Sequence, residues 1–203
     1  MKIITLGREF GSGGRELGKR LADQLGIAYY DREIVTELAR RTSYDEDYIS
    51  NALLRNTVSN IPIHFGHTIS YAPQSINATG SIYIEQHKLI RELAQKGNCV
   101  IVGRAASVIL EDFKPFRLFV HADMESRVRR CQERAEAGEN LSDKEMERHI
   151  RRIDAERKRY FDFFSDIPWG DRRCYELCVN TTGREIKELV PSVAEYIKAW
   201  YND

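Results

Sequence analysis

The stretch that decides the fold is KIITLGREFGSGGRELGKRLADQL, residues 2–25 of a 203-residue chain. It opens with an apolar run, Ile3–Leu6, passes through a turn with four glycines in eight residues, and continues with Leu17, Leu21 and Leu25 at four-residue spacing. The apolar run predicts a buried strand, and the leucine spacing predicts an amphipathic helix. A strand, a glycine turn and a helix in this order present backbone N–H groups and a positive helix end to a phosphate.

Two arginines, Arg8 and Arg15, flank the glycine turn, and both can fork onto phosphate oxygens. The turn departs from the usual phosphate-loop pattern, G-x-x-x-x-G-K-[ST]. If Gly13 is the second glycine of that pattern, Arg8 takes the place of the first glycine and Gly14 that of the lysine. We expect Arg15 to replace the lysine and an anion to lie against the amides of residues 10–16. The alternative is a tight structural turn or a dinucleotide-binding turn.

Composition points to one globular domain, 1–203, of a cytoplasmic protein. Nothing resembles a membrane span, a signal peptide or a low-complexity tract, and the formal net charge is zero, so neither a membrane nor a nucleic-acid partner is expected. Of the 31 basic residues 22 are arginine, and many lie between residues 127 and 159. That bias favours local recognition of oxyanions. A salt-bridged, solvated helix face is the alternative for most of these arginines.

The cysteines and histidines predict no metal site. Cys99 and Cys178 lie in apolar runs and are expected in the core, and the spacing of Cys174 and Cys178 does not suit a metal-binding pair. His64 and His67 are three residues apart, but they lie in a polar segment without further ligands.

Four more apolar runs predict strands, each separated from the next by helical sequence. An α/β fold follows, with a five-stranded parallel sheet between two layers of helices and right-handed crossovers. A terminal helix over residues 184–200 should bend or break at Pro191. The predicted strands after the first are Ile27–Tyr30, Cys99–Val102, Arg117–His121 and Leu177–Asn180.

Two segments are candidates for covering a bound substrate. Residues 56–80, rich in Ser, Asn, Thr and Gly, have no helical period, and segments of this length are usually functional or mobile. They are a lid over a substrate in one interpretation, and disorder or a homodimer contact in the other. We expect an acceptor-binding insertion over about 32–80 and a helical lid over about 138–165.

Polar residues that follow the strands are candidate ligands. Asp31 ends the second strand, and ligands of parallel sheets lie beyond the carboxyl ends of the strands. Asp31 could equally cap the next helix, and the two roles are compatible. The pair Gly103–Arg104 ends the third strand and would bring a guanidinium into the same crevice. A surface ion pair is the alternative for Arg104.

The charged helix that Ser142 and Glu145 should cap carries Arg151, Asp154 and Arg157 at three-residue spacing. We expect these three side chains roughly on one face, with the two arginines reaching a transferring phosphoryl group and Asp154 orienting one of them. The alternative is a salt-bridge ladder on a solvated helix.

These segments together resemble one family. They are GREFGSGGRELGKRLADQLG, YYDREI, CVIVGRA, LFVHADMESRVRR, the Arg-x-x-Asp-x-x-Arg helix and YELCVNTT. Over nearly the whole chain they resemble the cytidylate kinase-like family, which belongs with the P-loop nucleoside monophosphate kinases. The resemblance implies a P-loop kinase fold, ATP and Mg²⁺ as cofactors, and phosphoryl transfer to a nucleoside monophosphate, with CMP or dCMP the leading acceptor.

The resemblance also implies roles for individual residues. Asp31 would lie near the acceptor, Arg104 would contact its monophosphate, and Asp154 would belong to the acceptor site. Arg151 and Arg157 would clamp the phosphates from the lid as catalytic residues, together with Arg15. Residues 180–182 would lie near the ATP base. The expected ATP ligands are Arg8, Gly11, Ser12, Gly13, Gly14, Arg15 and Glu16.

Three departures from the family pattern leave other functions open. Gly14 stands where the lysine would be, Glu16 where a threonine would help to hold magnesium, and Ala105 where an aspartate follows the Gly-Arg pair. A non-catalytic nucleotide-binding protein and a kinase for another small acceptor, such as a shikimate-like acid, are the alternatives. A nucleic-acid-binding protein is the least supported, because the arginine-rich helices carry no interleaved aromatic residues.

Overall fold

The computed structural model describes residues 1–55, 78–135 and 141–202. Its five strands form one all-parallel sheet in the order β2-β3-β1-β4-β5, which confirms the predicted α/β fold. The central strand β1 pairs with β3 on one side and β4 on the other. The strands are β1 Ile3–Arg8, β2 Ala28–Tyr30, β3 Cys99–Val102, β4 Phe116–His121 and β5 Leu177–Asn180.

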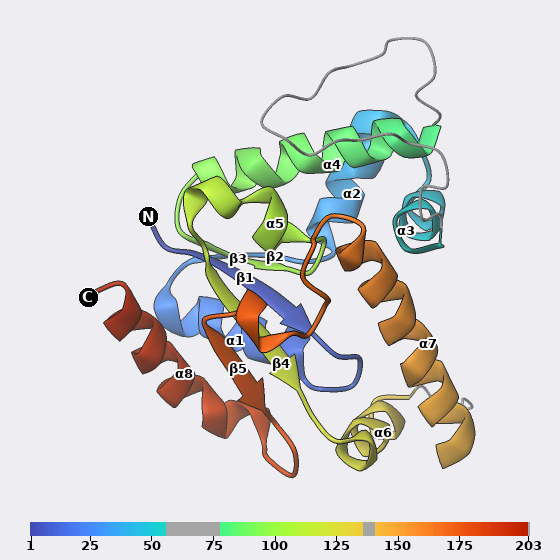
Figure 1. The fold of residues 1–203 in the computed structure, drawn as a ribbon, viewed down its shortest axis with the longest axis vertical. Helices are drawn as coiled ribbons and strands as arrows, with labels where there is room; N and C mark the ends of the chain where they lie inside the picture. Colours follow the sequence, from blue (N-terminus) through green and yellow to red (C-terminus); the bar gives the residue numbers. More distant parts are fainter. Residues whose placement is uncertain (56–77, 136–140, 203) are drawn as a thin grey trace.

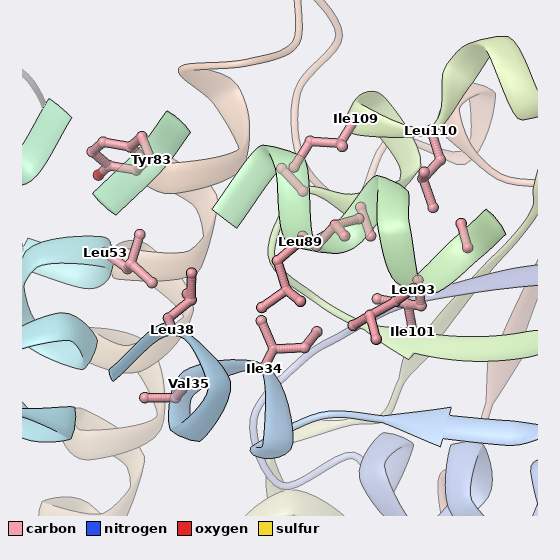
Figure 2. Packing of buried hydrophobic residues seen from close by; sticks show 14 of the residues in the cluster. Ile34, Val35, Leu38, Leu53, Tyr83, Leu89, Leu93, Ile101, Ile109 and Leu110 are labelled. Atoms are coloured by element: carbon pink, nitrogen blue, oxygen red, sulfur yellow. The ribbon is translucent and has the colours of Figure 1, made fainter. Parts of the chain in front are cut away.

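Helices cover both faces of the sheet, and the strand residues alternate between two cores. Ile4 of β1 and Val100 of β3 face the core that α1 and α8 close, whereas Ile3 and Ile101 face the opposite core. In that second core, shown in Figure 2, residues of α2, α4 and α5 meet around Leu89. A parallel sheet is apolar on both faces, so helices have to cover both of them.

Eight helices are described, and they connect the strands as expected. They are α1 Gly14–Leu25, α2 Glu33–Thr42, α3 Glu46–Arg55, α4 Ala78–Gln95, α5 Ala106–Ile109, α6 Met124–Gln132, α7 Asp143–Asp162 and α8 Ile186–Trp200. Figure 1 shows α1 and α8 on one side of the sheet and α4 and α5 on the other. None of the helices among these residues is both long and apolar enough to cross a bilayer.

The structure confirms some local expectations and corrects others. The predicted capping box of α7 is present, with Ser142 and Glu145 bonded to each other in both directions. The expected break at Pro191 is wrong, because α8 runs as one helix through that residue. Cys99 is buried as expected, but Cys178 is exposed, because β5 lies at the edge of the sheet. The segment interpreted as a lid or dimer contact, with His64 and His67, lies largely outside the described residues.

Candidate functional site

The candidate site lies at the carboxyl edge of the sheet, where the glycine turn joins β1 to α1. One half of this loop is tied down. The Phe10 N–H donates to Oδ1 of Asp154 at 2.8 Å, and the Thr181 hydroxyl donates to the carbonyl oxygen of Ser12 at 2.7 Å. The Gly11 backbone has a φ of +77°, and a Cβ atom there would lie 2.8 Å from the carbonyl oxygen of Arg127. Only glycine suits that position.

The other half of the loop packs against α8 on one side, where a Cβ atom on Gly13 would overlap Ile186, and lines a cavity on another. Gly13, the residue before α1, has left-handed backbone, and among the described residues no side chain caps the N–H groups of the first turn. A donor-side cavity of about 640 Å³ opens in front of this turn. It is lined by loop residues, by α6 and by α7, including Gly11, Gly13, Gly14, Cys131, Met146 and His149. Open backbone donors at a helix start form an anion-binding arrangement.

Arg127 of α6 holds the loop from behind. Its Nε donates to the Phe10 carbonyl oxygen at 2.7 Å, and its two terminal nitrogens face Glu9, at 3.3 Å, and Asp154. The Arg127 side chain is nearly buried, and each of its three nitrogens faces an oxygen. The loop conformation therefore depends on a buried ion-pair network that joins α6, α7 and the turn.

A second, acceptor-side cavity of about 550 Å³ lies beyond the ends of β1 and β3. Asp31 and Arg104, the two polar residues predicted to follow strands, both line it. Its lining joins a charged part to an aromatic part, with the rings of Tyr160, Phe161, Trp169 and Tyr175. The hydroxyl of Thr5, on β1, is buried there and has no hydrogen-bond partner among the described residues.

Three arginines, Arg8, Arg15 and Arg157, line both cavities. Nε of Arg15 lies 2.5 Å from Oδ2 of Asp31, and Nη2 of Arg8 lies 3.8 Å from Oδ1 of the same carboxylate. Arg157, from α7, donates to the Arg8 carbonyl oxygen at 3.1 Å and lies over the Phe10 ring at 5.4 Å. The two cavities therefore meet at the guanidinium groups of these three arginines.

Burial sets the electrostatics of this junction. It lowers the pKa of Arg8 to about 9, with the nearby Arg157 as the next cause, and it lowers the pKa of Arg157 to about 10. The pKa of Arg104 is also lowered, chiefly by burial. In each case removal from water disfavours the cation, and the carboxylates nearby offset this only in part. An anion placed among these groups would relieve that cost.

Several expected ligands lie elsewhere than predicted. The Ser12 side chain is fully buried, and its hydroxyl donates to the Glu9 carbonyl oxygen at 2.8 Å, so it is not free for a metal or phosphate. The Glu16 carboxylate lies 2.9 Å from Nε of Arg20 and 2.5 Å from Nη2 of Arg134 and does not line either cavity.

Asp31 does not cap α2. The N-cap residue of that helix is Arg32, and no side chain caps it. The Asp31 carboxylate instead faces the acceptor-side cavity and its arginines. Of the two roles weighed for Asp31, only the place in the cavity agrees with this geometry.

The expectation that Arg151, Asp154 and Arg157 share a face is wrong for Arg151. Six residues along an α-helix turn through about 600°, so positions 151 and 157 lie about 120° apart. Arg151 is 65% exposed and pairs with Glu147, which is the solvated salt bridge considered as the alternative. Asp154 lines neither cavity. Its carboxylate holds Arg127 and the loop, and its Oδ1 also lies 3.7 Å from Nη1 of Arg157, one of the two arginines that it was expected to orient.

Sequence reasoning missed Arg127 and the aromatic wall of the acceptor-side cavity. One signal for Arg127 was present: it lies at the start of α6, where the helix dipole disfavours a cation, so its presence calls for an anionic or carbonyl partner. No local pattern in the sequence indicated that Tyr160 and Trp169 line this cavity. For Tyr160, only the packing of α7 beside α6 and α3 determines it.

The described residues do not fit a metal ion held by the protein. No group of three or more His, Cys, Asp or Glu side chains in the described ranges has metal-binding geometry. The carboxylates near the loop, Glu9, Glu16 and Asp154, all face arginines. Mg²⁺ commonly keeps several waters and binds through substrate phosphates.

Sequence comparison gives the family. Residues 3–183 match the cytidylate kinase-like family. The chain belongs to this family. A cytidylate kinase from Staphylothermus marinus is 23% identical over 204 residues, covering 100% of both chains. This membership agrees with the glycine turn, Arg104 and the two adjoining cavities.

Solved structures share the fold. An uncharacterized protein from Eubacterium ventriosum is 27% identical, with a TM-score of 0.71, covering 98% of this chain and 99% of that one. Shikimate kinase from Bacteroides thetaiotaomicron, 14% identical, has a TM-score of 0.58 over 100% of this chain and 99% of its own. These likenesses show that the chain shares its fold with shikimate kinase.

Proposed function

We propose that this protein transfers the terminal phosphoryl group of ATP to a nucleoside monophosphate, most specifically CMP or dCMP. The observation that carries the proposal is the junction of two cavities at Arg8, Arg15 and Arg157. A donor on the glycine loop and an acceptor beyond β1 and β3 would meet at these three guanidinium groups. Kinases need in-line positioning and neutralisation of the equatorial oxygens, which such groups supply.

The acceptor side supports a nucleotide. Aromatic rings of Tyr160 and Trp169 line this cavity and offer apolar surface to a base, while Arg104 offers donors to a phosphate. The acidic groups of Glu46 and Asp47 line the same cavity and suit the amino group of a base such as cytosine. The name of the Staphylothermus marinus relative supports the same acceptor.

In the proposed reaction the residues of this chain bind and orient. The open N–H groups of the first turn of α1 hold the donor phosphates, and Arg157 reaches them from α7. Arg104 holds the acceptor phosphate, and Asp31 keeps Arg15 in place through their ion pair. Mg²⁺, bound to ATP, adds charge neutralisation. The residues of α7 form the proposed lid within a single domain, and α2 and α3 belong to the proposed acceptor insertion.

A non-catalytic nucleotide-binding function is the second candidate. The observation that favours it is the orientation of Ser12 and Glu16, which leaves no free hydroxyl or carboxylate on the loop to hold magnesium. The cytoplasmic location, a homodimer and the absence of a nucleic-acid partner stay predictions.

The test measures ADP release with MgATP and a panel of acceptors, together with calorimetric binding of ATP. The panel contains CMP, dCMP, UMP, AMP, GMP, shikimate and gluconate. We expect turnover with CMP or dCMP well above the others. Tight ATP binding without turnover on any acceptor would support the second candidate, and turnover on shikimate or gluconate alone would overturn the nucleotide assignment. No binding of ATP would overturn both.

A further inference from the structure

Arg8, the last residue of β1, and Gly14, the first residue of α1, lie against each other across the loop. A Cβ atom on Gly14 would lie 2.6 Å from Cβ and 3.0 Å from Cγ of Arg8, with Cβ of Val120 at 3.3 Å on another side. Separations of 2.6 Å are too short for carbon atoms in contact. Position 14 therefore has no room for a side chain while Arg8 keeps its place.

These two positions are also two of the three at which the loop departs from G-x-x-x-x-G-K-[ST]; the third is Arg15, at the Ser/Thr position. Arg8 stands at the first glycine and Gly14 at the lysine. The two departures involve the same space. The side chain of Arg8 occupies the place where a side chain at position 14 would begin. Arg8 therefore requires glycine at position 14, and a lysine at position 14 would require a smaller residue at position 8.

The Arg8 guanidinium extends from this contact to the junction of the two cavities. It lies against Gly103, where a Cβ atom would overlap Nη1 of Arg8. It lines both cavities, and within the described part of the chain it donates no hydrogen bond. Its nearest carboxylate oxygen, on Asp31, is 3.8 Å away. A largely buried guanidinium whose N–H groups lack hydrogen-bond acceptors favours the binding of an oxyanion through two parallel hydrogen bonds.

Arg15 is placed differently. Its side chain is 53% exposed, and its Nε already forms a close ion pair with Asp31, at 2.5 Å. The Asp31 carboxylate belongs to the acceptor-side cavity. Arg15 is therefore engaged on the acceptor side, whereas Arg8 has donors free beside the loop.

We propose that Arg8 and Gly14 form an exchanged pair, in which Arg8 supplies the cation that a phosphate loop ordinarily carries at position 14. Arg15, expected from the sequence to have that role, orients the acceptor side instead. This inference rests on the proposed kinase function. The positive charge of the missing lysine would then come from Arg8, the last residue of β1.

The test is a set of four proteins: the natural chain, Arg8→Gly, Gly14→Lys, and the double variant that restores G-x-x-x-x-G-K. We expect Arg8→Gly to lose on the order of 10³-fold in kcat/KM, as other phosphoryl-transfer arginines do. Gly14→Lys should lose activity and melt at a lower temperature, because its side chain overlaps Arg8. The double variant should exceed both single variants by at least about tenfold, which would be strong coupling for residues in contact.

The outcomes separate this inference from the kinase proposal. If the natural protein neither binds ATP nor turns over, the kinase proposal fails. If the natural protein is active and Arg8→Gly stays within about threefold of it, the exchange is wrong. A folded double variant that is no better than the poorer single variant would also overturn it.

If the double variant does not fold, a second pair of variants tests the exchange. Arg8→Met and Arg15→Met keep aliphatic bulk and remove one guanidinium each. We expect Arg8→Met to weaken ATP binding and to lower kcat, and Arg15→Met to raise mainly the KM for the acceptor. Equal effects of the two variants on ATP binding, or the reverse order, would contradict the exchange.

Discussion

Arg127 and Arg8 are arginines on opposite sides of the same loop, and they differ in what their nitrogens face. Arg127, behind the loop, meets the Phe10 carbonyl oxygen and the carboxylates of Glu9 and Asp154. Arg8, in front of it, has a single carboxylate at 3.8 Å among the described residues. The first guanidinium is matched by the protein, whereas the second is left for a ligand.

This difference separates stability from function. Removing one partner from a buried ion network leaves the others uncompensated, at a cost of about 3–5 kcal/mol. Removing an unmatched buried cation takes away a group whose burial is itself unfavourable, so the free protein should lose little stability or gain some. Functional groups that cost stability in the absence of a ligand are common at binding sites. The comparison therefore predicts opposite stability effects for the two sides of the loop.

The largest effect is expected from Arg127→Met, because Glu9 and Asp154 would lose the guanidinium that joins them, and Asp154 would keep only Arg157, at 3.7 Å, as an ion-pair partner among the described residues. We expect a loss of about 3–5 kcal/mol in the free energy of unfolding, measured by urea denaturation, and loss of ATP binding through a disordered loop. The matched control is Arg129→Met, an exposed position on the same helix. If Arg127→Met unfolds at the same urea concentration as the control, the network does not hold the loop.

The next effect is expected from Arg157→Gln, on the front of the loop. Its turnover should fall on the order of 10³-fold, because a cation at the junction is lost. Its free energy of unfolding should stay within about 0.5 kcal/mol of that of the natural protein, because the loss of its 3.7 Å pair with Asp154 is offset by relief of burial and of repulsion from Arg15. Arg152→Gln, exposed on the same helix, is the control. If Arg157→Gln loses stability but keeps its activity, Arg157 acts as Arg127 does, as part of the ion-pair network behind the loop.

The sequence allowed the fold to be predicted because the decisive signals are local. Strands β3 and β5 have the predicted bounds, since each is a short apolar run ended by a glycine or polar residues. Asp31 and Arg104 were placed in one cavity by topology alone, because parallel strands end at one edge. The position of a residue that directly follows a strand can therefore be predicted from the sheet.

Residues on the covering helices were harder to place. The spacing of Arg151 and Arg157 gives their angular separation but not which of them faces the loop. The structure decides it, because Arg157 donates to the carbonyl oxygen of Arg8 whereas Arg151 pairs with Glu147 in solvent. Arg127 could not be assigned for a related reason. Its partners Glu9 and Asp154 lie more than 20 residues away in sequence, on two other segments. The exchange of Arg8 and Gly14 likewise required the contact between strand and helix.

A smaller effect is expected from Asp31→Asn, which removes the carboxylate that Arg8 and Arg15 face. The front of the loop then gains net positive charge, so affinity for inorganic pyrophosphate should rise severalfold in calorimetry. The KM for the acceptor should rise by about tenfold, because a neutral amide holds Arg15 less strongly than a charged partner does. Asp23→Asn, an exposed change on α1, is the control. Weaker pyrophosphate binding by Asp31→Asn would show that Asp31 contributes a structural bond rather than charge.

The smallest effect at neutral pH concerns protonation. Burial, with Arg157 as the next cause, lowers the pKa of Arg8 to about 9, and an anion bound beside it would raise that pKa again. Below about pH 9 the free protein and its complex both hold the Arg8 proton, so ATP affinity should be level between pH 7 and 8.5. Above pH 9 the free protein loses a proton that the complex keeps, so affinity should fall with rising pH, by at most about tenfold per pH unit.

Calorimetry of ATP binding between pH 6 and 10 measures this dependence, and Arg8→Met separates it from other groups. That variant should bind more weakly at every pH and should lack the fall above pH 9 that belongs to Arg8. Its remaining dependence would come from Arg157, whose pKa burial lowers to about 10. If Arg8→Met instead keeps the full fall above pH 9, the proton of Arg8 does not cause it. In that case the contrast between Arg8 and Arg127 would not explain the binding.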